Sequence, residues 1–114
     1  MEECLFCRVV SGEMGTDLVH SSDHVVAFKD INPQAPVHLL IIPKEHIDSA
    51  RGLTDKHADL AAEIFETAAH LAKANEVDRT GWRLLTNIGP DAGQSVHHLH
   101  FHLLGGQQLG WPPG

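Results

Sequence analysis

The chain has 114 residues, of which 42% are hydrophobic, and its formal net charge is −7. This length predicts one compact domain, residues 1–114, with enough apolar side chains for a core. The acidic balance argues against a nucleic-acid partner, which would need clustered lysine and arginine, and no apolar run is long enough to span a membrane.

The first half of the chain predicts one short helix and three strands. The helix covers 4–11 and ends at Gly12, and strands follow over 17–22 and 24–30. Two closely spaced prolines then break the chain. The nearly continuous apolar run over 37–43 indicates a central strand that is covered on both faces.

The second half predicts one long helix and two more strands. Thr54 caps a helix over 55–74, whose apolar residues, Phe65 among them, recur at helical spacing. A strand over 81–87 leads into a turn-rich loop, and the last strand covers 97–103. The tail is too rich in glycine and proline for regular structure. The sum predicts an α+β fold with a five-stranded antiparallel sheet and two helices.

The last strand carries an unusual concentration of histidine. Four of the ten histidines fall between positions 97 and 102, and the spacing of two places His98, His100 and His102 on one face of a strand. The apolar residues that alternate with them would face the core, namely Leu99, Phe101 and Leu103. Spacing alone leaves three interpretations open: a solvated polar face, a metal site and a catalytic cluster.

The sequence around these histidines, residues 93–104, resembles the signature of the histidine triad superfamily, in which three histidines alternate with apolar residues. The likeness extends to residues 30–38, 42–46 and the terminal Trp-Pro-Pro-Gly of 111–114. Together these motifs resemble the branch of histidine triad nucleotide-binding proteins, the purine nucleoside phosphoramidases. The resemblance implies a HIT-like fold and a homodimer with one continuous sheet.

The same resemblance implies catalytic roles. His100 would attack the α-phosphorus and form a covalent nucleotidyl-histidine, which water then hydrolyses; imidazole suits this role because its unperturbed pKa lies near 6.5. His102 and the backbone amides of the preceding loop would donate to the phosphate oxygens. Ser95 would lie near the leaving group, and His38 would form a hydrogen-bonded relay behind the site.

Further residues are assigned to the purine nucleotide by the resemblance. Asp30 would accept the ribose hydroxyls, Asn87 would contact the phosphate region, and Gly93 and Gln94 belong to the phosphate-binding loop. Trp111 would reach the active site of the partner subunit. An apolar pocket with loose purine preference would hold the base, and its walls are Leu5, Phe6, Val9, Phe28 and Ile31.

Two cysteines, Cys4 and Cys7, are spaced so that they share one face of a helical turn. The residues alone leave open a redox pair or two buried apolar side chains. The resemblance implies a structural zinc ion held by these thiols together with His46 and His98. His98, the first histidine of the triad and so also a candidate catalytic residue, would then be a metal ligand instead of a proton donor. No organic cofactor is expected.

The expected function is therefore a hydrolase that releases AMP or GMP from nucleoside phosphoramidates. Three alternatives stay open: a dinucleoside polyphosphate hydrolase, a nucleotide-sensing module with little turnover, and a zinc-binding structural protein. The acidic N-terminus lacks the pattern of a signal peptide, so we expect a cytoplasmic protein.

Overall fold

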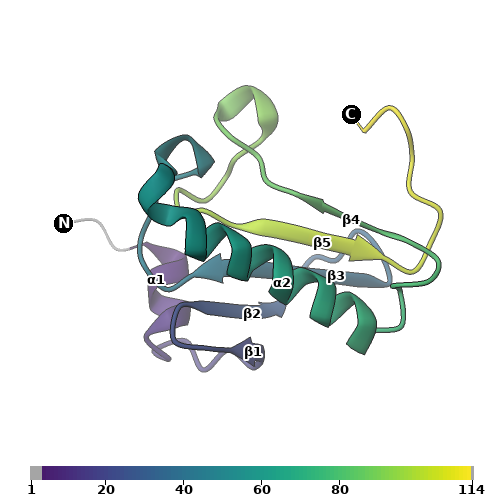
Figure 1. The fold of residues 1–114 in the computed structure, drawn as a ribbon, viewed down its shortest axis with the longest axis horizontal. Helices are drawn as coiled ribbons and strands as arrows, with labels where there is room; N and C mark the ends of the chain where they lie inside the picture. Colours follow the sequence, from purple (N-terminus) through teal and green to yellow (C-terminus); the bar gives the residue numbers. More distant parts are fainter. Residues whose placement is uncertain (1–3, 114) are drawn as a thin grey trace.

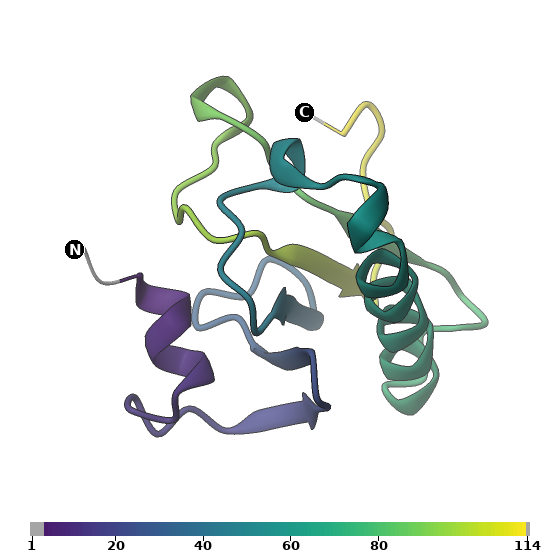
Figure 2. The ribbon, with the colours of Figure 1, turned by 60° about the vertical axis from the view of Figure 1, so that its left-hand side comes forward.

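The computed structural model of the protein describes residues 4–113. Five strands form one antiparallel sheet in the order β1-β2-β3-β5-β4, and two helices cover its opposite faces (Figures 1 and 2). The strands are β1 (Leu18–Ser21), β2 (Val25–Lys29), β3 (Val37–Pro43), β4 (Trp82–Leu85) and β5 (Phe101–Gly105). The helices are α1 (Leu5–Val10) and α2 (Ala58–Ala74), with 3-10 turns η1 (Ala50–Gly52), η2 (Asp55–His57) and η3 (Pro90–Ala92). The predicted α+β fold is confirmed.

Side chains of the central strands alternate between two cores, as the period of a strand requires. The α2 face packs odd-numbered strand residues against α2, including Val25, Ala27, Leu39, Ile41, Phe101 and Leu103. The α1 face packs even-numbered residues against α1, namely Val26, Phe28, Leu40 and Ile42. Because both faces are covered, β3 is buried from His38 to Pro43, and the prediction of a doubly covered central strand is confirmed.

The last strand starts later than predicted. The sequence pattern places it over 97–103, but β5 begins at Phe101. Continued in register, the β3–β5 ladder would bring Leu99 opposite Pro43, which has no N–H to donate. The N–H of Leu99 donates instead to the carbonyl of Ile47, at 2.6 Å. The first two triad histidines therefore precede the strand, in a segment held by other bonds.

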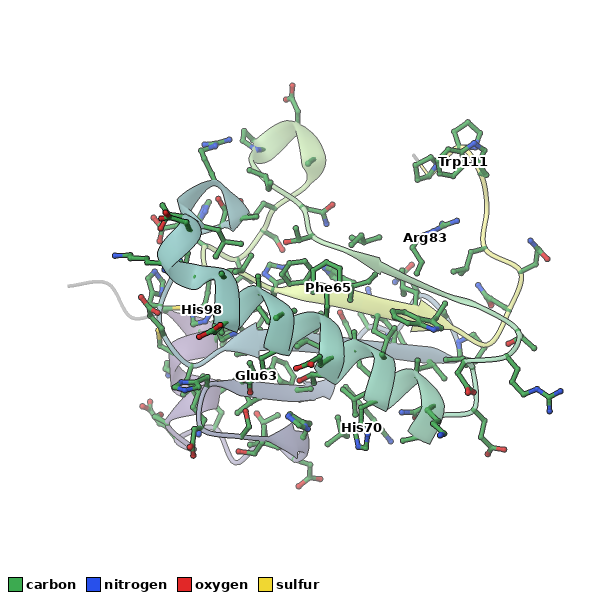
Figure 3. The ribbon with its side chains drawn as sticks, viewed as in Figure 1. Glu63, Phe65, His70, Arg83, His98 and Trp111 are labelled. Carbon is green, nitrogen blue, oxygen red and sulfur yellow. The ribbon has the colours of Figure 1, made fainter. Side chains whose placement is uncertain are left out.

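The long helix also differs from its prediction in two details. The span 55–74 opens with η2, and α2 itself begins at Ala58; the N–H of Thr54 donates to Nδ1 of His57 at this junction. Phe65, assigned by periodicity to the buried stripe, is 58% exposed (Figure 3), and its ring centroid lies 6.1 Å from that of Phe101 in a T-shaped arrangement. Within residues 4–113, no helix is both long enough and apolar enough to cross a membrane.

Candidate active site and metal centre

A cavity of about 340 Å³ opens on the α1 face, among α1, the end of β2 and the segment that precedes β5. Its polar lining includes Asp30, Ser95, His100 and His102. The five apolar residues predicted to hold a base all line it, namely Leu5, Phe6, Val9, Phe28 and Ile31. Ile31 is fully exposed, so it lies at the mouth of the cavity.

Other lining residues were missed in the sequence. Leu40 pairs with Phe28 in the β2–β3 ladder, so the strand register could have placed it in this wall. Met14 and Thr16 lie in an irregular turn, where no periodicity marks them. Val96 also lines the cavity and packs against the core of the α1 face.

The three triad histidines share the α1 face, as predicted, although two of them precede β5. The Phe6 ring lies 6.1 Å from that of His98 and 5.1 Å from that of His100, measured between centroids. The His102 ring is 5.2 Å from His100. Both His98 and His100 are buried, at 0% and 5% exposure, yet only His100 and His102 line the cavity.

The neighbours of His100 determine which of its nitrogens carries the proton. Nδ1 lies 2.7 Å from the carbonyl oxygen of His98, and a carbonyl can only accept, so Nδ1–H is the donor. In the neutral ring Nε2 is then unprotonated, and it has no hydrogen-bond partner among residues 4–113. An unengaged nitrogen on an imidazole that lines a cavity is equipped to act as a nucleophile.

A chain of hydrogen bonds fixes His102 in the opposite tautomer, with the proton on Nε2. The backbone N–H of Gln34 donates to Nδ1 of His38 at 3.0 Å, so Nε2 of His38 carries the proton. That Nε2–H lies 2.9 Å from Nδ1 of His102, which therefore accepts. The neutral His102 ring must then carry its own proton on Nε2. His38 thus lies behind the cavity in a relay, where the sequence placed it.

The protonation state of His102 follows from its surroundings. Burial, and then the neighbouring His100 and His38 rings, lower the pKa of His102 from 6.5 to about 4. His102 is therefore neutral at neutral pH, and its Nε2–H is a donor rather than a full positive charge.

Asp30 combines a turn role with a place in the cavity wall. Its Oδ1 accepts the N–H of Asn32 at 2.8 Å, which forms an Asx turn before the proline. Its Oδ2 lies 3.4 Å from Nε2 of His38. The carboxylate retains further lone pairs, so it can also accept hydroxyl groups from a bound ligand.

The other predicted nucleotide contacts lie outside this cavity's lining. The Gln94 amide braces the loop, because it accepts from the N–H of Gly89 and donates to the carbonyls of Asp48 and Val96. Gly93 has a φ of +83° and ends η3. Neither Asn87 nor Trp111 lines the cavity; their ligand contacts stay predictions, as do those of Gly93 and Gln94. Trp111 is 81% exposed and lies on the tail, far from His98 along the molecule's long axis (Figure 3).

A second cavity, of about 530 Å³, adjoins the first. The two share three lining residues, Leu5, Ser95 and Val96. The rest of the second lining is polar and comprises Cys4, His46, Asp48 and His97. Ser95 therefore lies where the two cavities meet.

The four predicted metal ligands converge beside this second cavity. One potential ligand atom from each of Cys4, Cys7, His46 and His98 lies within 4.8 Å of every other. Nδ1 of His98 is 3.2 Å from the Cys4 sulfur, and Nδ1 of His46 is 3.3 Å from the Cys7 sulfur. Cys4 also serves as the N-cap of α1, which fixes the two thiols on the first turn.

The hydrogen bonds behind the two imidazoles fit metal binding. Nε2–H of His98 donates to the carbonyl of Pro43 at 2.9 Å, and Nε2–H of His46 donates to the Asp48 carboxylate at 2.8 Å. Both rings therefore turn an unprotonated Nδ1 toward the thiols. A hydrogen bond from the other ring N–H to a carbonyl or a carboxylate is the usual support of a histidine that binds a metal. Burial lowers the pKa of His98, which also favours the neutral ring. Two thiols and two imidazoles are a donor set for a tetrahedral zinc ion.

A second group of potential ligands, Asp30, His38 and His102, is equally compact but does not fit a metal. Nδ1 of His38 accepts a backbone N–H, so its Nε2 carries the proton and has no lone pair for an ion. The hydrogen bonds therefore distinguish the two clusters, whereas their spacing does not.

Known proteins resemble the chain over nearly its whole length. Residues 3–110 match the family described as "Scavenger mRNA decapping enzyme C-term binding". The purine nucleoside phosphoramidase of Escherichia coli K12 is 38% identical over 109 residues, which cover 96% of this chain and 92% of that protein. The adenylylsulfatase HINT1 of Arabidopsis thaliana is 42% identical over 113 residues, or 96% and 76% of the two chains. The crystal structure of a HIT family hydrolase from Legionella pneumophila Philadelphia 1 superimposes with a TM-score of 0.96, at 46% identity, over 98% of this chain and 100% of the other.

Proposed function

The chain belongs to the histidine triad superfamily of nucleotide hydrolases, and from that premise we propose that it cleaves the P–N bond of purine nucleoside phosphoramidates. The observation that carries the proposal is the unprotonated Nε2 of His100 beside a cavity with an apolar wall and a carboxylate. The apolar wall would hold the base, and Asp30 would accept the ribose hydroxyls. That wall offers little hydrogen-bonding discrimination, so the preference among purines is expected to be loose.

The reaction proceeds in two displacements. Nε2 of His100 attacks the α-phosphorus, a P–Nε2 bond forms, and the bond from phosphorus to the leaving amine breaks as that amine gains a proton from solvent through the Ser95 hydroxyl. Water then attacks the same phosphorus, and the P–Nε2 bond breaks to release the nucleoside monophosphate. Nε2–H of His102 stabilises the negative charge on the phosphate oxygens in both steps.

The leaving group occupies the second cavity in this proposal. A phosphate beside His100 would project its leaving group past Ser95, which lines both cavities and supplies a hydroxyl at the junction. The second cavity is lined by a carboxylate, Asp48, and by no lysine or arginine. Such a lining favours an amine over a polyphosphate or a sulfate. It therefore favours the phosphoramidate over the dinucleoside polyphosphate alternative.

Replacing the nucleophile tests the proposal. We expect His100→Asn to abolish AMP release from an adenosine phosphoramidate, because the amide offers no comparable nitrogen, while AMP binding and the unfolding midpoint change little. Product formation would be followed by chromatography, with the dinucleoside polyphosphate as a competing substrate. Undiminished turnover by the folded variant would refute the mechanism, and tight AMP binding without turnover by the wild type would favour a sensing module.

We also propose that Cys4, Cys7, His46 and His98 hold a structural zinc ion. When bound, zinc would cross-link α1 to the segments after β3 and before β5. The hydrogen bonds to Pro43 and Asp48 support this, because they hold both imidazoles in the form that binds a metal. The ion would have no open position for a substrate, so we assign it no step in the reaction.

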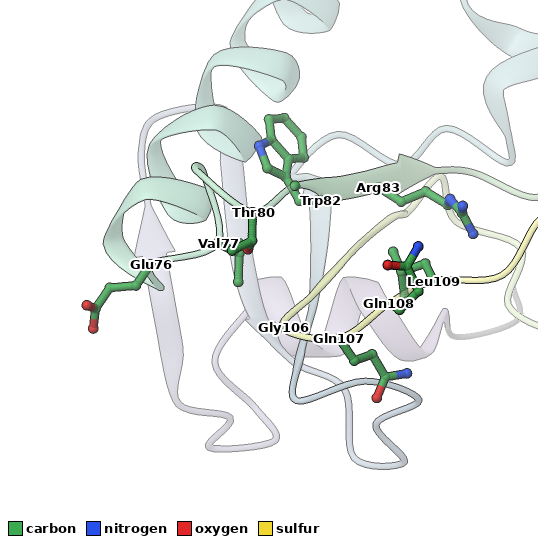
Figure 4. A pocket seen from close by; sticks show the side chains of 10 residues that line it. Glu76, Val77, Thr80, Trp82, Arg83, Gly106, Gln107, Gln108 and Leu109 are labelled. Atoms are coloured by element: carbon green, nitrogen blue, oxygen red, sulfur yellow. The ribbon is translucent and has the colours of Figure 1, made fainter.

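Homodimer formation remains part of the proposal. β4 is an outer strand of the sheet, and an unpaired strand edge can accept a second copy of the chain. A cavity of about 640 Å³ lies beside this edge, lined by the segment between α2 and β4, by Trp82 and Arg83, and by the tail (Figure 4). We expect sedimentation equilibrium to give the mass of two chains, with Trp111 able to reach the partner's site; the mass of one chain would contradict this.

A further inference from the structure

His100 lies just beyond the regular hydrogen-bond ladder. The β4–β5 pairing ends where Leu85 faces His102, and β5 itself begins at Phe101. The backbone of the proposed nucleophile therefore has no place in a strand, although its side chain must be held accurately. Hydrogen bonds outside the ladder must therefore hold the backbone of His100 in place.

One of these bonds comes from Thr86, the first residue after β4. Its hydroxyl donates to the backbone carbonyl of His100 at 2.7 Å, a length typical of a well-formed O–H···O bond. Thr86 is half-buried, and it lines neither of the two cavities described above. It therefore touches the nucleophile's backbone but has no place in the substrate-binding wall.

The two bonds to His100 act on different parts of the residue. Thr86 holds the carbonyl, and the carbonyl of His98 holds Nδ1 of the ring. Together they fix the residue at both ends and leave only Nε2 directed to the ligand. We propose that Thr86 is a positioning residue for the nucleophile, an inference that rests on the function proposed above.

The effect of losing this bond should appear in the chemical step. In-line attack requires the nitrogen to lie near the phosphorus in a narrow range of directions, and an error of about 1 Å can lower a rate about 100-fold. Without the hydroxyl, the His100 carbonyl loses its partner and the backbone is free to turn. Nucleotide affinity should change little, because the residues that line the cavity are untouched.

The test compares three variants of the full chain. Thr86→Val keeps the shape and removes the hydroxyl, Thr86→Ser keeps the hydroxyl, and Ser21→Ala removes a hydroxyl from an exposed position on the outer strand β1. We expect Thr86→Val to lower kcat about 10- to 100-fold with the Kd of AMP within about twofold of wild type. Thr86→Ser and Ser21→Ala should stay within about threefold of the wild-type kcat.

A spectroscopic measurement separates positioning from a general loss of stability. In proton–nitrogen correlation spectra of the imidazole rings, we expect Thr86→Val to shift or broaden the His100 signals and leave those of His57 unchanged. If Thr86→Val does not fold, Thr86→Ala takes its place with the same expected loss. An unchanged kcat in the folded variant, or no rescue by serine, would overturn the inference. Inactive wild-type protein would instead refute the proposed function.

Discussion

At the scale of single residues, His98, His100 and His102 differ in which ring nitrogen a fixed neighbour engages. Carbonyl oxygens accept hydrogen bonds from Nε2–H of His98 and from Nδ1–H of His100, while Nε2–H of His38 donates to Nδ1 of His102. Three identical side chains thereby present a lone pair to the thiols, a lone pair beside the cavity and an N–H donor, as their proposed roles require. This difference follows from the backbone partners of the rings, because a carbonyl can only accept a hydrogen bond and a backbone N–H can only donate one.

The titration of His102 predicts how stability depends on pH. Its folded-state pKa of about 4 lies below the ordinary 6.5, so the unfolded chain binds this proton more readily between these two values. The free energy of unfolding should therefore be fully developed above about pH 6.5 and fall as the pH drops toward 4. With allowance for solvent screening, we expect the loss to be on the order of 1–2 kcal/mol.

Urea unfolding of the wild type and His102→Asn, at several pH values in this range, measures that loss. The variant lacks the titrating ring, so its stability should fall less steeply with pH than that of the wild type. His98 contributes in the same direction in both proteins, because burial lowers its pKa also, and it cancels in the comparison. Parallel curves for the two proteins would show that His102 titrates normally.

The sequence could predict the positions of the site residues better than their states. Alternation placed the triad on one face, and the motifs brought Asp30 and Ser95 to the cavity and His38 to a position behind it. The proton positions depend on Pro43, Gln34 and other backbone groups that are remote in sequence. Thr86 carried no signal, because a threonine at the end of a predicted strand is ordinary until its partner is known.

At the scale of elements, the strongest patterns gave the most accurate boundaries. β3 matches its predicted span, 37–43, because a continuous apolar run marks a strand buried on both faces. β5 does not match, because the alternation persists through residues 97–100, which form a bend and an unpaired segment, and Pro43 opposite Leu99 has no N–H with which to extend the ladder. Periodicity reports which way side chains point; it does not report which backbone groups find a partner.

Helix α1 contacts the sheet through two buried side chains, of which Phe6 is the aromatic one and Val9 the smaller. Phe6 is 6% exposed, and its ring lies 5.6 Å from Phe28 and 5.1 Å from His100, each edge to face. We expect Phe6→Ala to lower the free energy of unfolding by about 3 kcal/mol, through the cavity that it leaves, and to weaken AMP binding. Urea titration and calorimetry measure the two effects.

Leu5→Ala is the matched control for this prediction. Leu5 lies on the same helix and lines the same cavity, but it is 44% exposed. Its truncation should weaken AMP binding while shifting the free energy of unfolding by less than about 1 kcal/mol. Equal destabilisation by the two variants would mean that the Phe6 contacts do not anchor the helix.

At the scale of the whole molecule, the site assembles from segments that are far apart in the chain. The proposed metal ligands alone come from the start of α1, the segment after β3 and the segment before β5, and Cys4 and His98 are 94 positions apart in the sequence. His98 also links the two functions, since its side chain joins the metal cluster and its backbone carbonyl holds the nucleophile's ring. Loss of the metal should therefore loosen the N-terminal helix first and the active site second.

Metal analysis and thermal unfolding test this arrangement together. We expect about one zinc ion per chain. The free energy of unfolding of the chelator-treated protein should be lower than that of the zinc-saturated protein by at least about 2–3 kcal/mol. Burial and the adjacent Cys4 thiol raise the pKa of Cys7 from 9.0 to about 11, so zinc must displace a proton there and its affinity should fall as the pH falls. His46→Ala should lower both zinc content and Tm, whereas His70→Ala, on the exposed side of α2, should change neither (Figure 3). Equal zinc content in the two variants would exclude the proposed ligand set.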